Sequence, residues 1–300
     1  LGFAEVHTHM AMGSEMSDGS EDVGPSAGGV IYGQAVNRFG VTEALKDCAM
    51  LHGENGQTDP EATLIDMEPG RTHSTEGWPS FIDWPFHDSQ FHQQMYWRWV
   101  QRAWMSGLRL MTIHGTNIEA LCEVAQATAP SRGQTGVECR DMPLGVSQVE
   151  YLYDIQDYID AQFGGPGEGF YRIVRDPAEA RQVIADGKLA VIPGLEFSNI
   201  FGCNVTFNPD GSETRACTKE QIDAEIDRVW DLGVRQIFPY HDVDSALGGA
   251  GLFSEILNFV NFNGTQSFWE TYECEDGGDG DSLFYTAGFV ASSGAGLGMD

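Results

Sequence analysis

Basic residues are scarce in this chain of 300 residues: lysine and arginine number 16, against 45 aspartate and glutamate residues. The formal net charge at pH 7 is therefore −29. Such a charge repels polyanions, because phosphate backbones are bound mainly through lysine and arginine. The composition excludes nucleic acid as an expected partner and favours a protein of a salty or extracellular setting.

Long apolar segments are also lacking. No uninterrupted apolar stretch reaches the roughly 20 residues that a membrane-spanning helix needs. The first residues do not form the basic start and apolar run of a signal peptide. We therefore expect no membrane span, although a hydrophobic content of 41% is enough for one large core or two modest ones.

The six cysteines lack the CxxC spacing that is typical of zinc-thiolate sites. An even number without that spacing favours disulfides, which form in oxidising compartments. Cys203 and Cys217 flank an Asn-Pro-Asp-Gly sequence that predicts a reversal of the chain, so they are the first expected pair. Cys122 and Cys139 are the second. We expect an extracellular, cell-surface or periplasmic protein.

Helices and strands are predicted to alternate along most of the chain. A strand over residues 3–9 precedes a long region, 10–84, which is rich in Gly, Ser, Asp and Pro and is interpreted as a loop insertion. After it, the order helix, glycine, strand occurs three times, at 88–114, 177–196 and 218–241. This alternation is typical of a parallel sheet with covering helices.

Two Ser/Thr-x-x-Glu/Gln patterns predict where helices begin. Ser147 with Glu150 predicts the start of a helix that ends at Gly164, and Thr218 with Gln221 predicts the start of another. Both helices would pack on the parallel sheet.

Strand after strand ends in a residue that can do chemistry. In a (β/α)8 barrel the carboxyl ends of the strands converge on one mouth, where the active site lies. We therefore expect an α/β fold of the (β/α)8 TIM-barrel class. Residues 1–270 would form the N-terminal portion with about four strands, and the acidic, Gly/Ser-rich residues 271–300 a loop or connection. The strand-end residues are His7, His9, His114, Glu196 and His241.

These residues allow more than one interpretation. His7 and His9 lie on the same side of a strand and suit zinc, or they are solvent-facing residues of a strand end. Glu196 is a candidate ligand that bridges two metal ions, or it forms a salt bridge or helix cap. His241 could be a third ligand or a polarising donor to the substrate, and His114 fits a core histidine equally well. The histidines without comparable context are His52, His73, His87 and His92.

Four segments carry a resemblance to a known family. They are EVHTHMAMG, GWPSFIDWPFHDSQFHQQMYWRWVQRAWMSGLRLM, AEARQVIADGKLAVIPGLE and EIDRVWDLGVRQIFPYHDVDSALGG. In order and in type they resemble the membrane (renal) dipeptidase-like metallohydrolases of the amidohydrolase superfamily, especially their large exported bacterial relatives. The likeness covers most of residues 3–270. It implies a metal-dependent hydrolase that cleaves an amide bond of a small peptide-like substrate with a metal-activated water.

Carried over by position, the resemblance assigns a role to each of four residues. It makes His7 and His9 ligands of the first metal, Glu196 the carboxylate that bridges two zinc ions, and His241 the residue that stabilises the oxyanion. The dipeptidases usually have His-x-Asp in the first motif, whereas this chain has His-x-His. Dipeptide specificity is therefore left open.

The family's remaining metal ligands come from later strands, but no histidine follows His241. We expect these ligands from a C-terminal half of the same protein, present as a continuous or a cleaved chain, and a homo-oligomer is a further expectation. Two alternatives remain. One is a non-catalytic extracellular structural or binding protein with a degenerate barrel; the other is a His-x-His phosphoesterase, whose phosphate substrate the negative charge disfavours.

Overall fold

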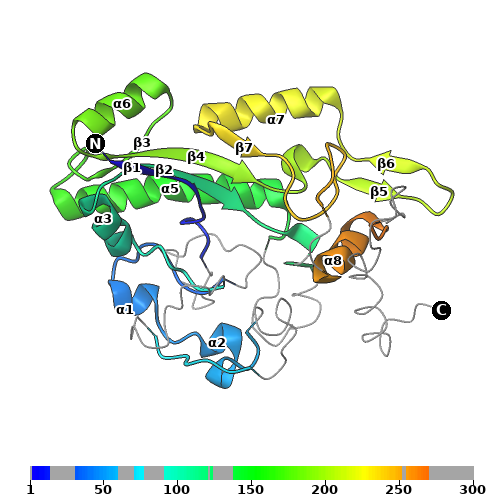
Figure 1. Cartoon of the computed structure of the whole chain (residues 1–300), viewed down its shortest axis with the longest axis horizontal. Helices are drawn as coiled ribbons and strands as arrows, with labels where there is room; N and C mark the ends of the chain where they lie inside the picture. The colour runs from blue at the N-terminus through cyan, green and yellow to red at the C-terminus, as the bar shows by residue number, and fades with distance from the viewer. Residues whose placement is uncertain are drawn as a thin grey trace, which may run out of the picture.

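A parallel β-sheet is the central element of the computed structural model (Figure 1). The structure describes residues 2–13, 31–59, 71–77, 91–120, 122–123, 138–251 and 255–269. The five strands of the sheet are β1 (Phe3–Thr8), β2 (Leu108–Thr116), β3 (Tyr171–Ile173), β4 (Leu189–Glu196) and β7 (Gln236–Phe238). β2 lies between β1 and β4, and β3 and β7 share the other edge of β4, at its start and its end respectively.

Helices follow the strands in the predicted alternation. They are α3 (Trp97–Met105), α5 (Asp141–Phe163), α6 (Pro177–Ala185) and α7 (Lys219–Leu232). α5 packs against β2, β3 and β4, and α6 packs against β4 (Figure 1). Nearly every residue of β4 is buried, as expected for a central parallel strand that is covered on both faces. The mixed α/β class is confirmed, and the curled parallel sheet is compatible with part of an α/β barrel.

The remaining elements are short, apart from one helix. They are α1 (Val41–Ala44), α2 (Ala49–His52), the 3-10 turns η1 (Glu54–Gly56) and η4 (Ile200–Gly202), the hairpin β5 (Val205–Phe207) and β6 (Glu213–Arg215), and α8 (Glu255–Thr265). The described parts of the insertion 10–84 contain only short helices. No helix among the described residues is both long and apolar enough to cross a bilayer. The predicted connection 271–300 lies outside the described residues.

Both predicted disulfides are confirmed. Cys203 and Cys217 close the β5–β6 hairpin, whose turn holds Gly211 at a φ of 82°. Cys122 and Cys139 form the second bridge. Two disulfides are compatible with an oxidising, extracellular setting.

The helix boundaries are only partly as predicted. Thr218 and Gln221 form the expected capping box at the start of α7, each side chain bonding to the backbone N–H of the other residue. The helix predicted from residue 88 instead begins at Trp97, because the preceding segment is extended and pairs with Tyr32. Residues 88–90 lie outside the described part of the chain.

The predicted start of α5 at Ser147 and Glu150 is wrong, because both residues lie inside a helix that begins at Asp141. The Asp141 carboxylate accepts hydrogen bonds from Asn117 Nδ2 at 2.9 Å and from the Asn199 backbone N–H at 3.0 Å. These partners are far from Asp141 in the sequence, so a local capping pattern does not reveal them.

We predict that Gly145→Ala destabilises the protein although alanine is the better helix former. Gly145 lies in α5, and a Cβ there would overlap the ring of Phe197, which follows β4. Overpacking of this kind costs about 1–3 kcal/mol of unfolding free energy, measurable by urea denaturation. Gly264→Ala in α8 is the matched control, since among the described residues its Cβ would meet Ala120 alone, at 3.5 Å. Equal stability of the two variants would contradict the packing described here.

We also predict a pH dependence that arises from Asp141. Burial, with Glu119 nearby, raises the pKa of this carboxyl to about 7. The native group is thus protonated where the unfolded group, with an ordinary pKa of 3.8, is ionised. Its contribution to stability is full below about pH 4 and is lost as the pH rises towards 7. Asp141→Asn should flatten this decline in urea unfolding, whereas Asp157→Asn on the exposed face of α5 should leave it unchanged.

Candidate functional site

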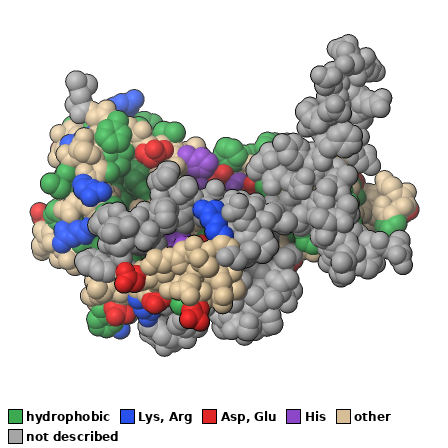
Figure 2. Space-filling view, turned by 60° about the horizontal axis from the view of Figure 1, so that its bottom comes forward, with side chains coloured by type: hydrophobic (Ala, Val, Ile, Leu, Met, Phe, Trp, Pro, Cys, Tyr) green, Lys and Arg blue, Asp and Glu red, His purple; other side chains and the backbone are tan. Residues whose placement is uncertain are grey.

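A group of titratable side chains lies where the parallel strands end. The structure brings together all the residues that the sequence placed at strand ends, namely His7, His9, His114, Glu196 and His241. His7 belongs to β1, and His9 follows that strand closely. Figure 2 shows histidine surface on one face of the molecule, bordered by hydrophobic side chains.

Glu196 lies at the centre of this group. Its Oε2 atom is 2.6 Å from Nε2 of His7 and 3.4 Å from Nε2 of His9, and its Oε1 atom is 3.5 Å from Nε2 of His241. Burial alone would raise the pKa of the carboxyl, but the facing imidazoles hold it below its ordinary value. Glu196 is therefore an ionised, almost buried carboxylate with histidines facing both oxygens.

Alternation along β2 and β4 places His114 and Glu196 on the same side of the sheet. In the parallel register His114 lies beside Gly194. Two residues further along, Thr116 lies beside Glu196. Residues two positions apart, and directly paired residues of neighbouring strands, face the same side. A Cβ at position 194 would lie 2.6 Å from Cδ2 of His114, so glycine provides the space for this imidazole.

An irregularity in β1 helps to orient the first histidine. Glu5 pairs with Met111 and Thr8 with Ile113, so three steps along β1 match two steps along β2. Irregularities of this kind redirect side chains and are common beside active sites. The hydroxyl of Thr8 then anchors the strand by donating to the carbonyl of Thr112 at 2.8 Å.

The orientation of His9 favours a lone pair directed at Glu196. Nδ1 of His9 lies 3.3 Å from the backbone carbonyl oxygen of His114, to which it can only donate. In the neutral ring Nε2 then carries the lone pair, and this atom faces the Glu196 carboxylate. Burial lowers the pKa of His9 despite the opposing effect of Glu196, so the neutral form is favoured. Two acceptors that face each other are best reconciled by a cation between them.

His114 lies buried within this group. The sequence alone could not decide between a role in the site and a role in the core for this residue. Its ring centre is 4.8 Å from that of His7, and neither ring nitrogen has a hydrogen-bond partner among the described residues. Burial, with His7 and His9 nearby, lowers the pKa of His114 to about 4 although Glu196 opposes the shift. Ligand atoms of His7, His114 and Glu196 lie within 4.8 Å of one another. The donors could therefore hold a metal ion, and imidazole with carboxylate suits zinc.

The loop after β7 positions His241. Its Nε2 lies 3.1 Å from Oδ2 of Asp242 as well as near Glu196. Ser198 Oγ accepts hydrogen bonds from the backbone N–H groups of Asp242 and Val243, at 3.0 and 3.1 Å. The segment that follows β4 thus holds the loop that carries His241.

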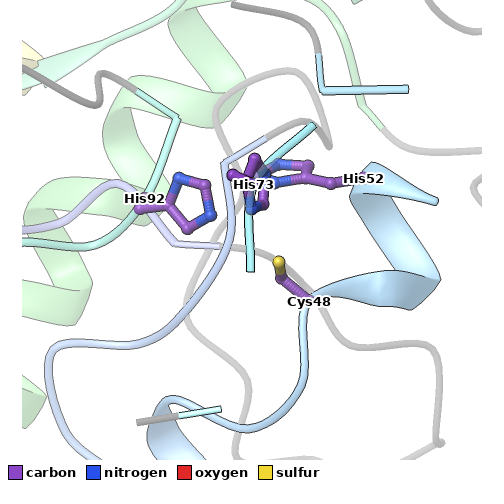
Figure 3. Close-up of side chains that lie close together, drawn as sticks. All are labelled: Cys48, His52, His73 and His92. Carbon is purple, nitrogen blue, oxygen red and sulfur yellow. The ribbon is translucent and has the colours of Figure 1, made fainter. Parts of the chain in front are cut away.

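A second group of possible metal ligands combines residues of the insertion with His92, which follows it, and this grouping was not predicted from the sequence. Figure 3 shows its four side chains, which are Cys48, His52, His73 and His92. Their ligand atoms lie within 4.8 Å of one another, so this cluster also could hold a metal ion. The available signal was the Cys-x-x-x-His spacing of Cys48 and His52, which places both on one face of a helical turn. His87, also unassigned, lies outside the described residues.

Comparisons with known proteins identify no relative. No protein-family model matches the chain, and neither curated proteins nor solved structures give a significant match. The resemblance to the dipeptidases rests on the four sequence segments alone.

We predict that Gly194→Ala disturbs the group around Glu196. The added methyl group would displace the His114 ring, and the contact of that ring with His7 would be lost. Histidine ring NMR should show shifted His7 and His114 signals, while the signals of His52 serve as an internal control because this residue belongs to the other cluster. An unchanged spectrum would contradict the described packing of His114 on β4.

Proposed function

We propose that this chain belongs to a zinc-dependent hydrolase of the dipeptidase type, which cleaves an amide bond of a small peptide-like substrate. One observation carries the proposal: three imidazoles face a single ionised carboxylate at the carboxyl end of a parallel sheet. In α/β folds this end of the sheet is the usual place of ligand and active sites.

The two oxygens of Glu196 have different neighbours, which supports its role as a bridging ligand. Oε2 faces His7 and His9, whereas Oε1 faces His241. In the proposal His7 and His9 hold the first metal ion, and Glu196 offers one oxygen to each of two ions. His114, whose nitrogens lie beside the same carboxylate, is an additional donor that the family resemblance does not assign.

Each residue of the chain then has a defined task. Zinc ions held here would supply a nucleophilic hydroxide near neutral pH and polarise the carbonyl of the substrate. Glu196 remains ionised, since the surrounding imidazoles lower its pKa. In the proposal His241, held by the loop after β7, would stabilise the oxygen on which negative charge develops. Asp242, 3.1 Å from the His241 ring, orients that imidazole.

The proposal includes a (β/α)8 barrel that is completed by further strands. β1 lies at one edge of the described sheet, and β3 and β7 share the other; β1 and β7 carry large exposed apolar side chains, namely Phe3, Val6, Ile237 and Phe238. Exposed edges of parallel strands are normally paired or covered. A C-terminal half of the same protein, as a continuous or cleaved chain, is the proposed partner and the source of the remaining ligands. Its proposed location is outside the cytoplasm, in keeping with the two disulfides.

The experiment uses the native protein with any chain that co-purifies, and measures its zinc content and its hydrolysis of dipeptides. Glu196→Gln should lose the activity and the zinc that is held at this site, because an amide is a weak and neutral ligand. His241→Ala should keep the zinc but lower kcat/KM by about 10²–10³-fold, as expected for loss of one oxyanion donor. Glu168→Gln, at an exposed position, is the matched control and should leave the zinc content and the hydrolysis of dipeptides unchanged.

Two results would overturn the proposed function. One is dipeptide cleavage by the Glu196→Gln variant at the rate of the wild-type protein. The other is cleavage of phosphomonoesters but not of dipeptides, which would favour the phosphoesterase alternative. A protein that binds zinc at Glu196 and hydrolyses neither substrate would fit the non-catalytic alternative.

A further inference from the structure

The insertion and the segment around His92 together form a largely buried cluster of one thiol and three imidazoles, which the proposed hydrolase does not use. Cys48 directly precedes α2 and His52 is the last residue of that helix, while His73 and His92 come from two other segments (Figure 3). The three ring centres lie 4.5–5.5 Å from one another, and Sγ of Cys48 is directed towards the rings. Sulfur and imidazole nitrogen are the donors that zinc prefers in structural sites.

Local structure fixes each ligand. The backbone N–H of His52 donates to the Cys48 carbonyl at 2.9 Å, so one helical turn presents both side chains on the same face. His92 is held in an extended segment that pairs with Tyr32. A Cβ at Gly56 would lie 2.5 Å from Cδ2 of His73, so this glycine leaves space for the His73 ring.

His73 also shows a pairing that calls for a cation. Its Nδ1 lies 2.7 Å from the backbone carbonyl oxygen of Ser74, to which it can only donate. The other nitrogen, Nε2, lies 2.9 Å from Oδ2 of Asp59, which is buried. In the neutral ring this nitrogen is an acceptor that faces a carboxylate. A proton or a metal ion is needed at this position.

We propose that Cys48, His52, His73 and His92 bind a zinc ion that has a structural role in the insertion. Four protein donors and strong burial leave no open coordination position for a substrate, which distinguishes structural from catalytic zinc. The Ser74 carbonyl orients His73 through Nδ1, and Asp59, which lies beside Nε2, balances the charge of the ion. The ion would connect two segments of the insertion, whose described helices are too short to be stable alone, to the segment that carries His92.

The same cluster supports the strand end that carries His9. Gln93, the residue after His92, donates through its side-chain amide to the carbonyl of Met10 at 3.1 Å and also to the carbonyl of Met12. Met12 in turn donates its backbone N–H to the carbonyl of His9 at 3.0 Å. Fixing His92 therefore fixes the segment that leaves the candidate site.

Cobalt(II) substitution tests the structural site separately from the Glu196 site. Zinc is removed from the full-length protein, and cobalt(II) is added while absorption is recorded. A thiolate ligand gives an intense near-ultraviolet charge-transfer band, which imidazole and carboxylate ligands do not give. We expect this band in the wild-type protein and in Glu196→Gln, and its loss in Cys48→Ser. Cys274→Ser is the matched cysteine control and should keep the band; Cys274 lies outside the described part of the chain.

Metal content provides the second measurement. Cys48→Ser and His92→Gln should each lower the zinc content by about one ion per chain, and zinc should raise the thermal midpoint of wild type more than that of either variant. If the variants fail to fold, the wild-type protein still decides the question. A wild-type protein without the thiolate band would overturn the structural site and leave the proposed hydrolase untouched, whereas loss of the band in Glu196→Gln would show that the two sites are not separate.

Discussion

The burial of one carboxylate constrains most of the candidate site. Glu196 ends a strand that is buried along nearly its whole length, where an isolated charge would be strongly unfavourable. Its compensation comes from imidazoles at the end of β1 and after β7, and the His114 ring of β2 lies beside them. The register of β2 on β4 brings the His114 ring into this group. The hydrogen bond from the Asp242 backbone to Ser198 holds the loop that carries His241.

Much of this arrangement could be predicted because parallel strands follow simple rules. Periodicity located the strands that end near His9, His114 and Glu196, and parallel strands bring their carboxyl ends to one edge. The sequence could not decide between a ligand and a core role for His114. That choice depends on the register of two strands 80 residues apart, which sets Gly194 beside the ring.

The insertion could not be predicted in the same way, for a physical reason. His73 lies in a segment with no periodic pattern and His92 in a segment that was predicted to be helical, and both approach Cys48 only through tertiary contacts. The start of α5 shows the same limit, since the groups that bond to the Asp141 carboxylate come from Asn117 and Asn199. Where the partners of a polar group are distant in sequence, local motifs place boundaries and ligands poorly.

Access to solvent separates the two clusters, although both consist largely of imidazoles. The His7 side chain is 46% exposed, whereas that of His52 is 0% exposed. An exposed ligand set at the end of a sheet leaves space for a substrate, while a closed set of four donors does not. The net charge of −29 adds to this difference, because a negative field concentrates cations and disfavours anionic substrates at the open site. The same charge would assist the binding of metal ions at both proposed sites and would narrow the substrates of the proposed hydrolase.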